Sequence, residues 1–167
     1  MTAERIDLLI AAPKTLAHLV VEASDAQLDQ EPTGGGWGAR TVLAHLRDFE
    51  FLVARLAVER ALAEDAPAVS SLDNRAWEQD RNRTRDRKDW LLAEFALQRQ
   101  ASASILRALR ESDWQRALQT PFAGRITVSA LVDWWLEHDL THVAQLEACV
   151  GETLAEVLAR RAQMRDT

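Results

Sequence analysis

Apolar residues recur at every third or fourth position along four long stretches of the chain, which is the period of an α-helix with one buried face. The stretches cover about residues 3–23, 38–63, 86–110 and 127–150. No segment shows the sustained alternation of apolar and polar residues that is typical of a half-buried strand. The pattern therefore predicts four long helices and no strand.

Polar and turn-forming runs separate these stretches. The connection before residue 38 contains P-T-G-G-G-W-G, which is rich in residues that break helices. Pro13 lies inside the first stretch, so we expect either a kink or two consecutive short helices there. Shorter helical pieces are expected at 71–88, at 111–116 with Ser112 or Asp113 as the cap, and at 152–164 after the C-cap Gly151.

The second stretch also predicts which residues face the core. His45, Phe49, Leu52 and Leu56 fall on one stripe of a regular helix, with charged residues on the other side. Four helices joined by short connections most simply form a four-helix bundle. We therefore expect a single all-α domain over residues 1–167, with extra short helices and a C-terminal helix.

Composition narrows the class of protein. The 167 residues include 47% hydrophobic and 28% charged residues, enough to bury a full core without disulfides. The formal net charge of −6 argues against a general nucleic-acid binder, which needs clustered positive charge. A single cysteine fits a reducing compartment, and no apolar run approaches the roughly 18 residues of a membrane span. We expect a cytoplasmic protein with neither nucleic acid nor membrane as a partner.

Candidate chemistry concentrates on three of the four histidines. His138 and His142 lie four residues apart, so on one helix they are about 40° apart around the axis and roughly 6 Å along it. His45 lies in the second stretch, and a facing helix can bring it to the pair. Three histidines form a catalytic pattern for zinc because the fourth position stays open. Nitrogen ligands also suit nickel, copper or iron, so the ion stays open.

Three motifs then carry a resemblance to a known family. They are G-G-G-W-G-A-R-T-V-L-A-H-L-R-D-F-E, D-N-R-A-W and G-R-I-T-V-S-A-L-V-D-W-W-L-E-H-D-L-T-H-V-A-Q-L. In this order, along nearly the whole chain, they resemble the DinB-like superfamily. The resemblance implies an up-down-down-up four-helix bundle, frequently a homodimer. It also implies a divalent ion, zinc or nickel, held by His45, His138 and His142.

The resemblance also implies chemistry. Relatives with assigned activity include thiol S-transferases and mycothiol-dependent isomerases, in which a metal activates the thiol of a low-molecular-weight cofactor. Two positions depart from the family pattern. Gly38 stands where a serine N-cap is common, at a cost of a few tenths of a kcal/mol. The segment L-Q-T-P-F-A-G-R lacks the histidine or tyrosine that often precedes the fourth helix, so no substrate-handling role is carried over to it.

Neighbours of the histidines are candidates for supporting roles. Asp48, one turn after His45, is a candidate acceptor for an imidazole N–H or a candidate general base. Gln145, three residues past His142, is a candidate to hydrogen-bond a bound ligand. Trp134, one turn before His138, is either a core anchor or a wall of the site.

The leading hypothesis is a metal-dependent enzyme whose open metal position activates a thiol or water toward a small electrophile, so that its partner is a small-molecule substrate. Arg47 and Arg55 would then meet a carboxylate of a thiol cofactor, unless they form ordinary surface ion pairs. The main alternative is a non-catalytic metal-binding bundle used in stress response or partner binding. In a third interpretation the histidines are plain core residues. Fold and site alone do not assign a reaction, so the sequence does not decide between the enzyme and the non-catalytic bundle.

Overall fold

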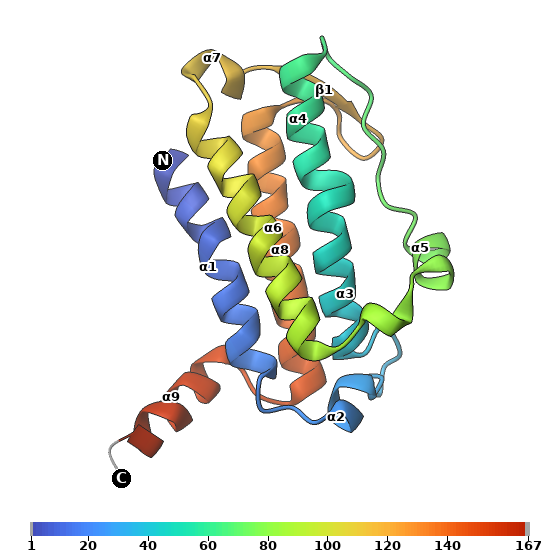
Figure 1. The fold of residues 1–167 in the computed structure, drawn as a ribbon, viewed down its shortest axis with the longest axis vertical. Helices are drawn as coiled ribbons and strands as arrows, with labels where there is room; N and C mark the ends of the chain where they lie inside the picture. The colour runs from blue at the N-terminus through green and yellow to red at the C-terminus, as the bar shows by residue number, and fades with distance from the viewer. Residues whose placement is uncertain (1, 166–167) are drawn as a thin grey trace.

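Four long helical rods form the body of the protein, as the sequence predicts. The structure is a computed structural model that describes residues 2–165. The rods are α1, α3 continued through η1 and α4, α6, and α8 (Figure 1). The bounds of the elements are α1 Thr2–Val20, α2 Asp25–Asp29, α3 Ala39–Phe49, η1 Glu50–Arg55, α4 Leu56–Ala63, α5 Asn74–Asp80, η2 Arg83–Arg85, α6 Lys88–Ala108, α7 Glu111–Trp114, β1 Ala117–Thr120, β2 Gly124–Thr127, α8 Val128–Val150 and α9 Leu154–Arg165.

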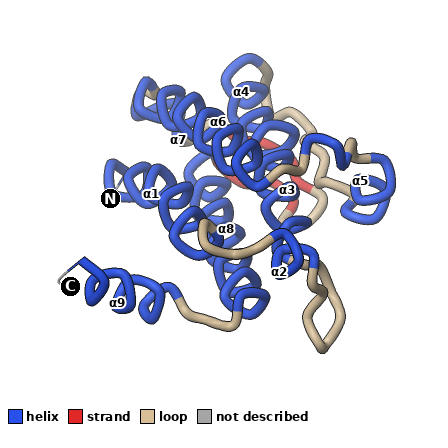
Figure 2. The backbone as a smooth tube through the Cα atoms, turned by 60° about the horizontal axis from the view of Figure 1, so that its bottom comes forward, coloured by secondary structure: helices blue, strands red, loops and turns tan. Residues whose placement is uncertain are grey.

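The rods are arranged up-down-down-up. Figure 1 shows α1 and α8 running in one direction and the α3–α4 rod and α6 running in the other. Helix α1 packs against α6 and α8, and α3 packs against the same two helices. The first and second rods therefore occupy opposite corners of the bundle. Helix α9 projects from one end, where it packs on α1 (Figure 2).

Several helix boundaries differ from the expectation. Helix α1 continues through Pro13 as one element, so the interpretation of two short helices is wrong. The single turn of α7 is capped by Arg110, whose backbone N–H donates to Asp113 at 2.9 Å, and not by Ser112 or Asp113. Helix α8 begins after Thr127, whose side chain accepts from a backbone N–H, and ends at Gly151 with φ of 74°. Among the described residues no helix combines the length and the apolar content that a membrane span requires.

A π-helical segment, η1, changes the phase of the second rod. A π turn uses more residues than the 3.6 of an α-helix, so the chain returns to the inner face one residue late. Glu50, Val53 and Ala54 therefore face the core. Leu52 and Leu56, which a regular helix would bury, are each 45% exposed, so the prediction for these two residues is wrong.

A small β-hairpin connects α7 to α8, whereas the sequence predicted no strand. Strands β1 and β2 pair antiparallel, with Leu118 opposite Ile126. Four residues per strand are too few to show the alternation that identifies a strand in sequence. The hairpin also fixes the long connection after α4, because Gln119 exchanges backbone hydrogen bonds of 2.9 Å with Pro67 and Val69.

One buried ion cluster ties the rods together. Arg99 on α6 is 1% exposed, and its guanidinium donates to Glu50 of η1 at 3.0 Å and to Asp139 of α8 at 2.6 Å. The same guanidinium donates to the carbonyl of Leu9 on α1 at 2.9 Å. Each of the four rods thus contributes a group to this cluster.

We predict that Arg99→Met destabilises the protein by about 3–5 kcal/mol, because it leaves two buried carboxylates without their cation. The measurement is the free energy of unfolding from urea titration. The matched control is Arg107→Met on the same helix, whose partner Asp7 lies 3.4 Å away and is largely exposed. This control should cost less than about 1 kcal/mol. Equal losses for the two variants would contradict a structural role of the cluster.

Candidate metal centre

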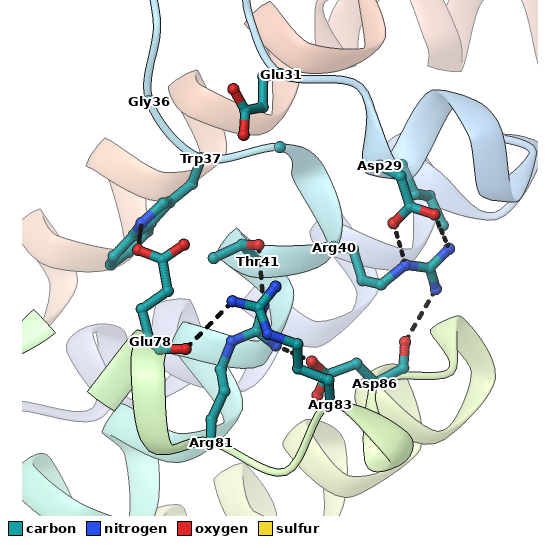
Figure 3. A pocket seen from close by; sticks show the side chains of 12 residues that line it. Asp29, Glu31, Gly36, Trp37, Arg40, Thr41, Glu78, Arg81, Arg83 and Asp86 are labelled. Carbon is teal, nitrogen blue, oxygen red and sulfur yellow. Dashed lines mark hydrogen bonds and ion pairs between the residues drawn. The ribbon is translucent and has the colours of Figure 1, made fainter. Parts of the chain in front are cut away.

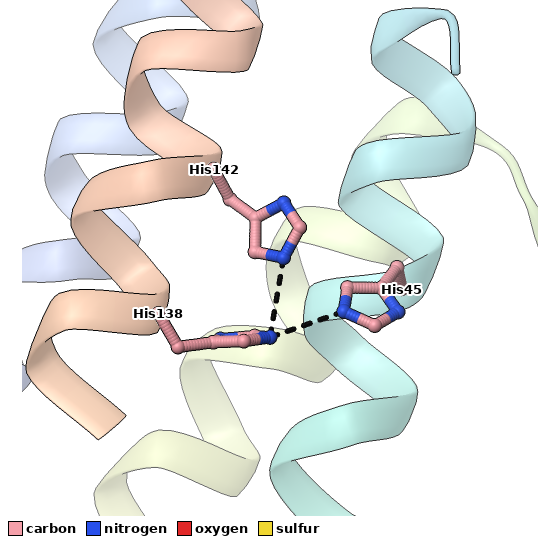
Figure 4. Close-up of side chains that lie close together, drawn as sticks. All are labelled: His45, His138 and His142. Atoms are coloured by element: carbon pink, nitrogen blue, oxygen red, sulfur yellow. Dashed lines mark hydrogen bonds between the residues drawn. The ribbon is translucent and has the colours of Figure 1, made fainter. Parts of the chain in front are cut away.

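Three imidazoles converge between α3 and α8. The Nε2 atom of His138 lies 3.1 Å from Nε2 of His45 and 3.1 Å from Nε2 of His142 (Figure 4). One nitrogen from each ring lies within 4.8 Å of the others. His45 and His142 are buried, and the side chain of His138 is 13% exposed. The structure therefore brings together all three histidines that the sequence singles out.

Helix geometry produces this convergence. His138 and His142 are one turn apart on the face of α8 that packs against α3. Phe49, one turn after His45, stacks on the ring of His138 with centroids 3.9 Å apart. The packing of α3 against α8 therefore places the three imidazole rings next to one another.

This arrangement fits a cation. The Nε2 atom of His138 carries at most one hydrogen when the ring is neutral, so it can donate to one neighbouring Nε2 but not to both. Without a cation, the single in-plane site of this nitrogen, either one hydrogen or one lone pair, forms one linear hydrogen bond and leaves the second contact without one, whereas a cation can bind the lone pairs of all three nitrogens. Three nitrogens bound at 2.0–2.1 Å in tetrahedral geometry would be about 3.3 Å apart. The two distances from Nε2 of His138, 3.1 Å each, are close to that value, and the three nitrogens all lie within 4.8 Å of one another.

Side chains behind the rings orient them. The Oε1 atom of Gln145 lies 2.7 Å from Nδ1 of His142. If Nδ1 carries the hydrogen and donates, Nε2 keeps its lone pair for a metal. Asp139 has Oδ1 3.8 Å from Nδ1 of His138, and its other oxygen is held by Arg99. Gln145 thus contacts a histidine directly, whereas the sequence suggested contact with a bound ligand.

Asp48 is directed away from the imidazoles. Its carboxylate accepts from Nε of Arg47 at 2.7 Å and from Nε1 of Trp77 at 2.9 Å. Among the described residues, no hydrogen bond joins Asp48 to a histidine. Trp77 in turn meets the ring of His45 edge-on at 5.4 Å, and Trp37 lies 5.0 Å from the same ring. Asp48 therefore contacts the site through Trp77, a partner that the sequence did not indicate.

Burial keeps the imidazoles of His45 and His142 neutral. Removal from water lowers the pKa of His45 from 6.5 to about 3, and the nearby His142 and His138 add to the shift. Burial likewise lowers the pKa of His142 to about 4, and His138 contributes. Neutral imidazole is the form that binds metals. These two ligands are therefore ready to bind at neutral pH.

A pocket of about 300 Å³ opens onto the three rings. Its other walls come from Phe49, Phe122 and Trp134, together with the loop residues 71 and 72 and the first residue of α5, Asn74. Trp134 therefore lines the site, which is one of the two roles that the sequence allowed, a wall of the site or a core anchor. Because all three histidines border the same pocket, a ligand entering it can reach the point where their Nε2 atoms converge.

A larger pocket of about 450 Å³ lies beside Trp37 but does not include the histidines (Figure 3). Its charged groups bind one another: Arg40 pairs with Asp29, and Arg81 pairs with Asp86. Glu78 accepts from Nε1 of Trp37 at 2.9 Å. Two arginines of this pocket thus form ion pairs with its own aspartates, and Glu78 in its wall supports the indole that packs on His45.

Acidification should destabilise the metal-free protein. In the unfolded chain both histidines take up protons near pH 6.5, whereas the folded protein resists protonation until about pH 4 and about pH 3. The unfolded state therefore binds more protons over this range, so stability present above pH 6.5 is lost as pH falls. The check is urea unfolding at a series of pH values with a chelator present. His45→Gln should show a shallower loss than the wild type, and an equal slope would contradict this cause.

Gln145→Ala should weaken metal binding about 10–100-fold, because the imidazole of His142 loses the acceptor that orients it. Competition with a chromophoric chelator measures the affinity. Gln100→Ala, which removes an exposed glutamine on α6, is the control and should bind metal as the wild type does. Identical affinities for the two variants would remove Gln145 from the site.

Comparisons with known proteins agree with this geometry. A relative of Oceanobacillus iheyensis, "Putative metal-dependent hydrolase OB0782", is 27% identical over 137 residues, covering 80% of this chain and 78% of the relative. "Putative metal-dependent hydrolase YfiT" of Bacillus subtilis is 27% identical over 151 residues, covering 87% and 84%. The solved structure of YfiT, described as "a probable metal-dependent hydrolase with an unusual four-helix bundle topology", superposes with a TM-score of 0.75. That match has 26% identity and covers 91% of this chain and 89% of YfiT.

The family comparison covers most of the chain. The family model of the DinB superfamily matches residues 8–146, a range that covers most of each of the four rods and includes the three histidines. The resemblance inferred from the sequence motifs is therefore confirmed, and the chain belongs to the DinB superfamily.

Proposed function

We propose that this protein is a metal-dependent hydrolase of a small electrophile. His45, His138 and His142 hold one divalent ion, zinc or nickel, through their Nε2 atoms. The observation that carries the proposal is the convergence of three Nε2 atoms at the base of one open pocket. Three protein ligands leave a coordination position for water or substrate, which is the arrangement of catalytic sites.

When bound by three neutral imidazoles, a divalent ion keeps its full charge, polarises a substrate oxygen and lowers the pKa of water at its open position toward 7. The protein's own residues have separate tasks. Gln145 holds the ring of His142 in the binding orientation, and Asp139 places a carboxylate oxygen 3.8 Å from Nδ1 of His138. Phe49 and Trp134 wall the pocket and limit the access of bulk water.

Water is the nucleophile that the pocket favours over a thiol cofactor. Low-molecular-weight thiols with carboxylates need a cation to bind them, and no arginine or lysine is among the residues that line the pocket. Arg47, a sequence candidate for that role, is buried beside Asp48 and Asp86 and lines a different pocket. The names of the relatives point to hydrolysis as well.

The test is elemental mass spectrometry of tag-free protein, together with assays of neutral esters and amides with and without added metal. Wild-type protein should contain about one equivalent of zinc or nickel, and His142→Ala should contain little and lose the metal-dependent rate. His18→Ala, which changes a histidine of α1 outside the cluster, is the control and should retain both. Metal affinity should fall as the pH approaches about 4, where His142 begins to take up a proton, because protonated imidazole does not bind metal.

The outcomes separate the alternatives. Metal without any metal-dependent rate would support the non-catalytic metal-binding bundle. Absence of metal in every variant, even after zinc or nickel is added back, would leave the histidines as core residues and would refute the proposal.

A further inference from the structure

We propose that the pocket over the metal centre selects an uncharged electrophile with a flat aromatic body, which stacks on Phe122 and Trp134 while its reactive group reaches the three histidines. This inference rests on the proposed function and names the substrate class of the same site. Phe122 is the specificity-determining residue that it assigns.

Aromatic rings form a continuous wall from the surface to the metal ligands. Phe122 stacks on Trp134 with centroids 4.4 Å apart and an interplanar angle of 21°. Trp134 lies 5.5 Å from Phe49 and 5.7 Å from His138. All four rings line the pocket. A planar group entering along this wall would remain in contact with a ring over its whole path.

The hairpin holds Phe122 in place although the side chain is 44% exposed. In the turn, the buried hydroxyl of Thr120 accepts from the N–H of Ala123 and donates to the carbonyl of Gly124, both at 3.1 Å. Gly124 has φ of 65°, a conformation that suits glycine. An aromatic ring presented to solvent on a fixed turn is poised for stacking on a ligand, because little side-chain entropy remains to be lost.

Among the described residues, the lining carries no aspartate, glutamate, lysine or arginine, which determines the charge of the ligand. A phosphate or carboxylate away from the metal would lose water there without gaining a counter-ion. The lining also includes Ser71 and Asn74, whose side chains make no hydrogen bond within the described part of the chain. They can therefore bind a neutral polar group of the substrate.

Hydroxamates provide a test that reads binding and not turnover. Acetohydroxamate and benzohydroxamate present the same metal-binding group, and the second adds an uncharged ring; 4-carboxybenzohydroxamate adds a charge to that ring. Dissociation constants for zinc-loaded protein are measured by isothermal titration calorimetry. We expect benzohydroxamate to bind at least about tenfold more tightly than acetohydroxamate, since a buried ring adds both area and stacking. The carboxylated compound should lose most of that gain.

Phe122→Ala should reduce the preference for the ring by about two- to tenfold and leave the affinity for acetohydroxamate unchanged. Phe51→Ala is the matched control, because Phe51 is also about half exposed but borders a different pocket. Phe122→Leu keeps the apolar cover of the hairpin without the ring, and it should behave as Phe122→Ala does. The three hydroxamates are also compared on the wild-type protein, so that part of the test does not depend on whether the Phe122 variants fold.

The outcomes distinguish this inference from the proposed function. If acetohydroxamate does not bind to zinc-loaded protein, the open metal position and the proposed function fail. If acetohydroxamate binds but benzohydroxamate binds no better, or the carboxylated compound binds best, the metal site stands and the inferred substrate class is overturned. An unchanged preference in both Phe122 variants would overturn the role of that residue.

Discussion

The buried guanidinium of Arg99 is the group on which the packing of the bundle, and with it the position of the three histidines, depends. It binds carboxylates from η1 and α8 and a carbonyl from α1, and its carbon lies over the rings of Phe95 and Trp135. Burial acts to raise the pKa of Asp139, but the charge and hydrogen bond of Arg99, together with the nearby His138, outweigh it and hold that pKa below its usual range. The pKa of Glu50 is raised by burial, which Arg99 offsets only in part. A charge in this position is costly unless its partners are fixed, so the cluster sets how the rods pack.

This constraint reaches the metal centre through both carboxylates. Glu50 begins the π-helical segment directly after Phe49, and the wider turn is what directs its side chain into the core. Asp139 follows His138, so the oxygen that Arg99 holds belongs to the residue next to a metal ligand. The position of α8 relative to α3, and hence the distance between His45 and His138, is thereby linked to the buried ion cluster. Pre-set ligand geometry of this kind lowers the cost of binding a metal.

The sequence was sufficient to predict the rods and the three histidines that the structure brings together. Apolar periodicity identified the long helices, and the i,i+4 spacing of His138 and His142 identified the pair on one face. Exposure of Leu52 and Leu56 was not predictable, because a π segment has no signal in apolar periodicity and reveals itself only through tertiary contacts. Strands of four residues were missed for a related reason, since their pairing depends on the loop at residues 67–69.

Supporting residues were harder to predict than ligands. Arg99 looks like any surface arginine of a helix, and only the packed structure shows that it is buried. Asp48 is close to His45 in sequence, yet its carboxylate is bound by Arg47 and Trp77. Phe122 lies in a turn where sequence suggested no substrate contact. The contacts of these residues are made between distant segments, so local sequence patterns do not indicate them.

The central claim is that three imidazole nitrogens hold one divalent ion and leave a position open to the pocket. X-ray absorption at the metal edge of purified, tag-free protein tests it most directly, because the spectrum reports the type, number and distance of the ligands. The account predicts three imidazole nitrogens at about 2.0–2.1 Å and at least one further light ligand from water. A first shell containing sulfur, a protein carboxylate or fewer than three imidazoles would contradict it.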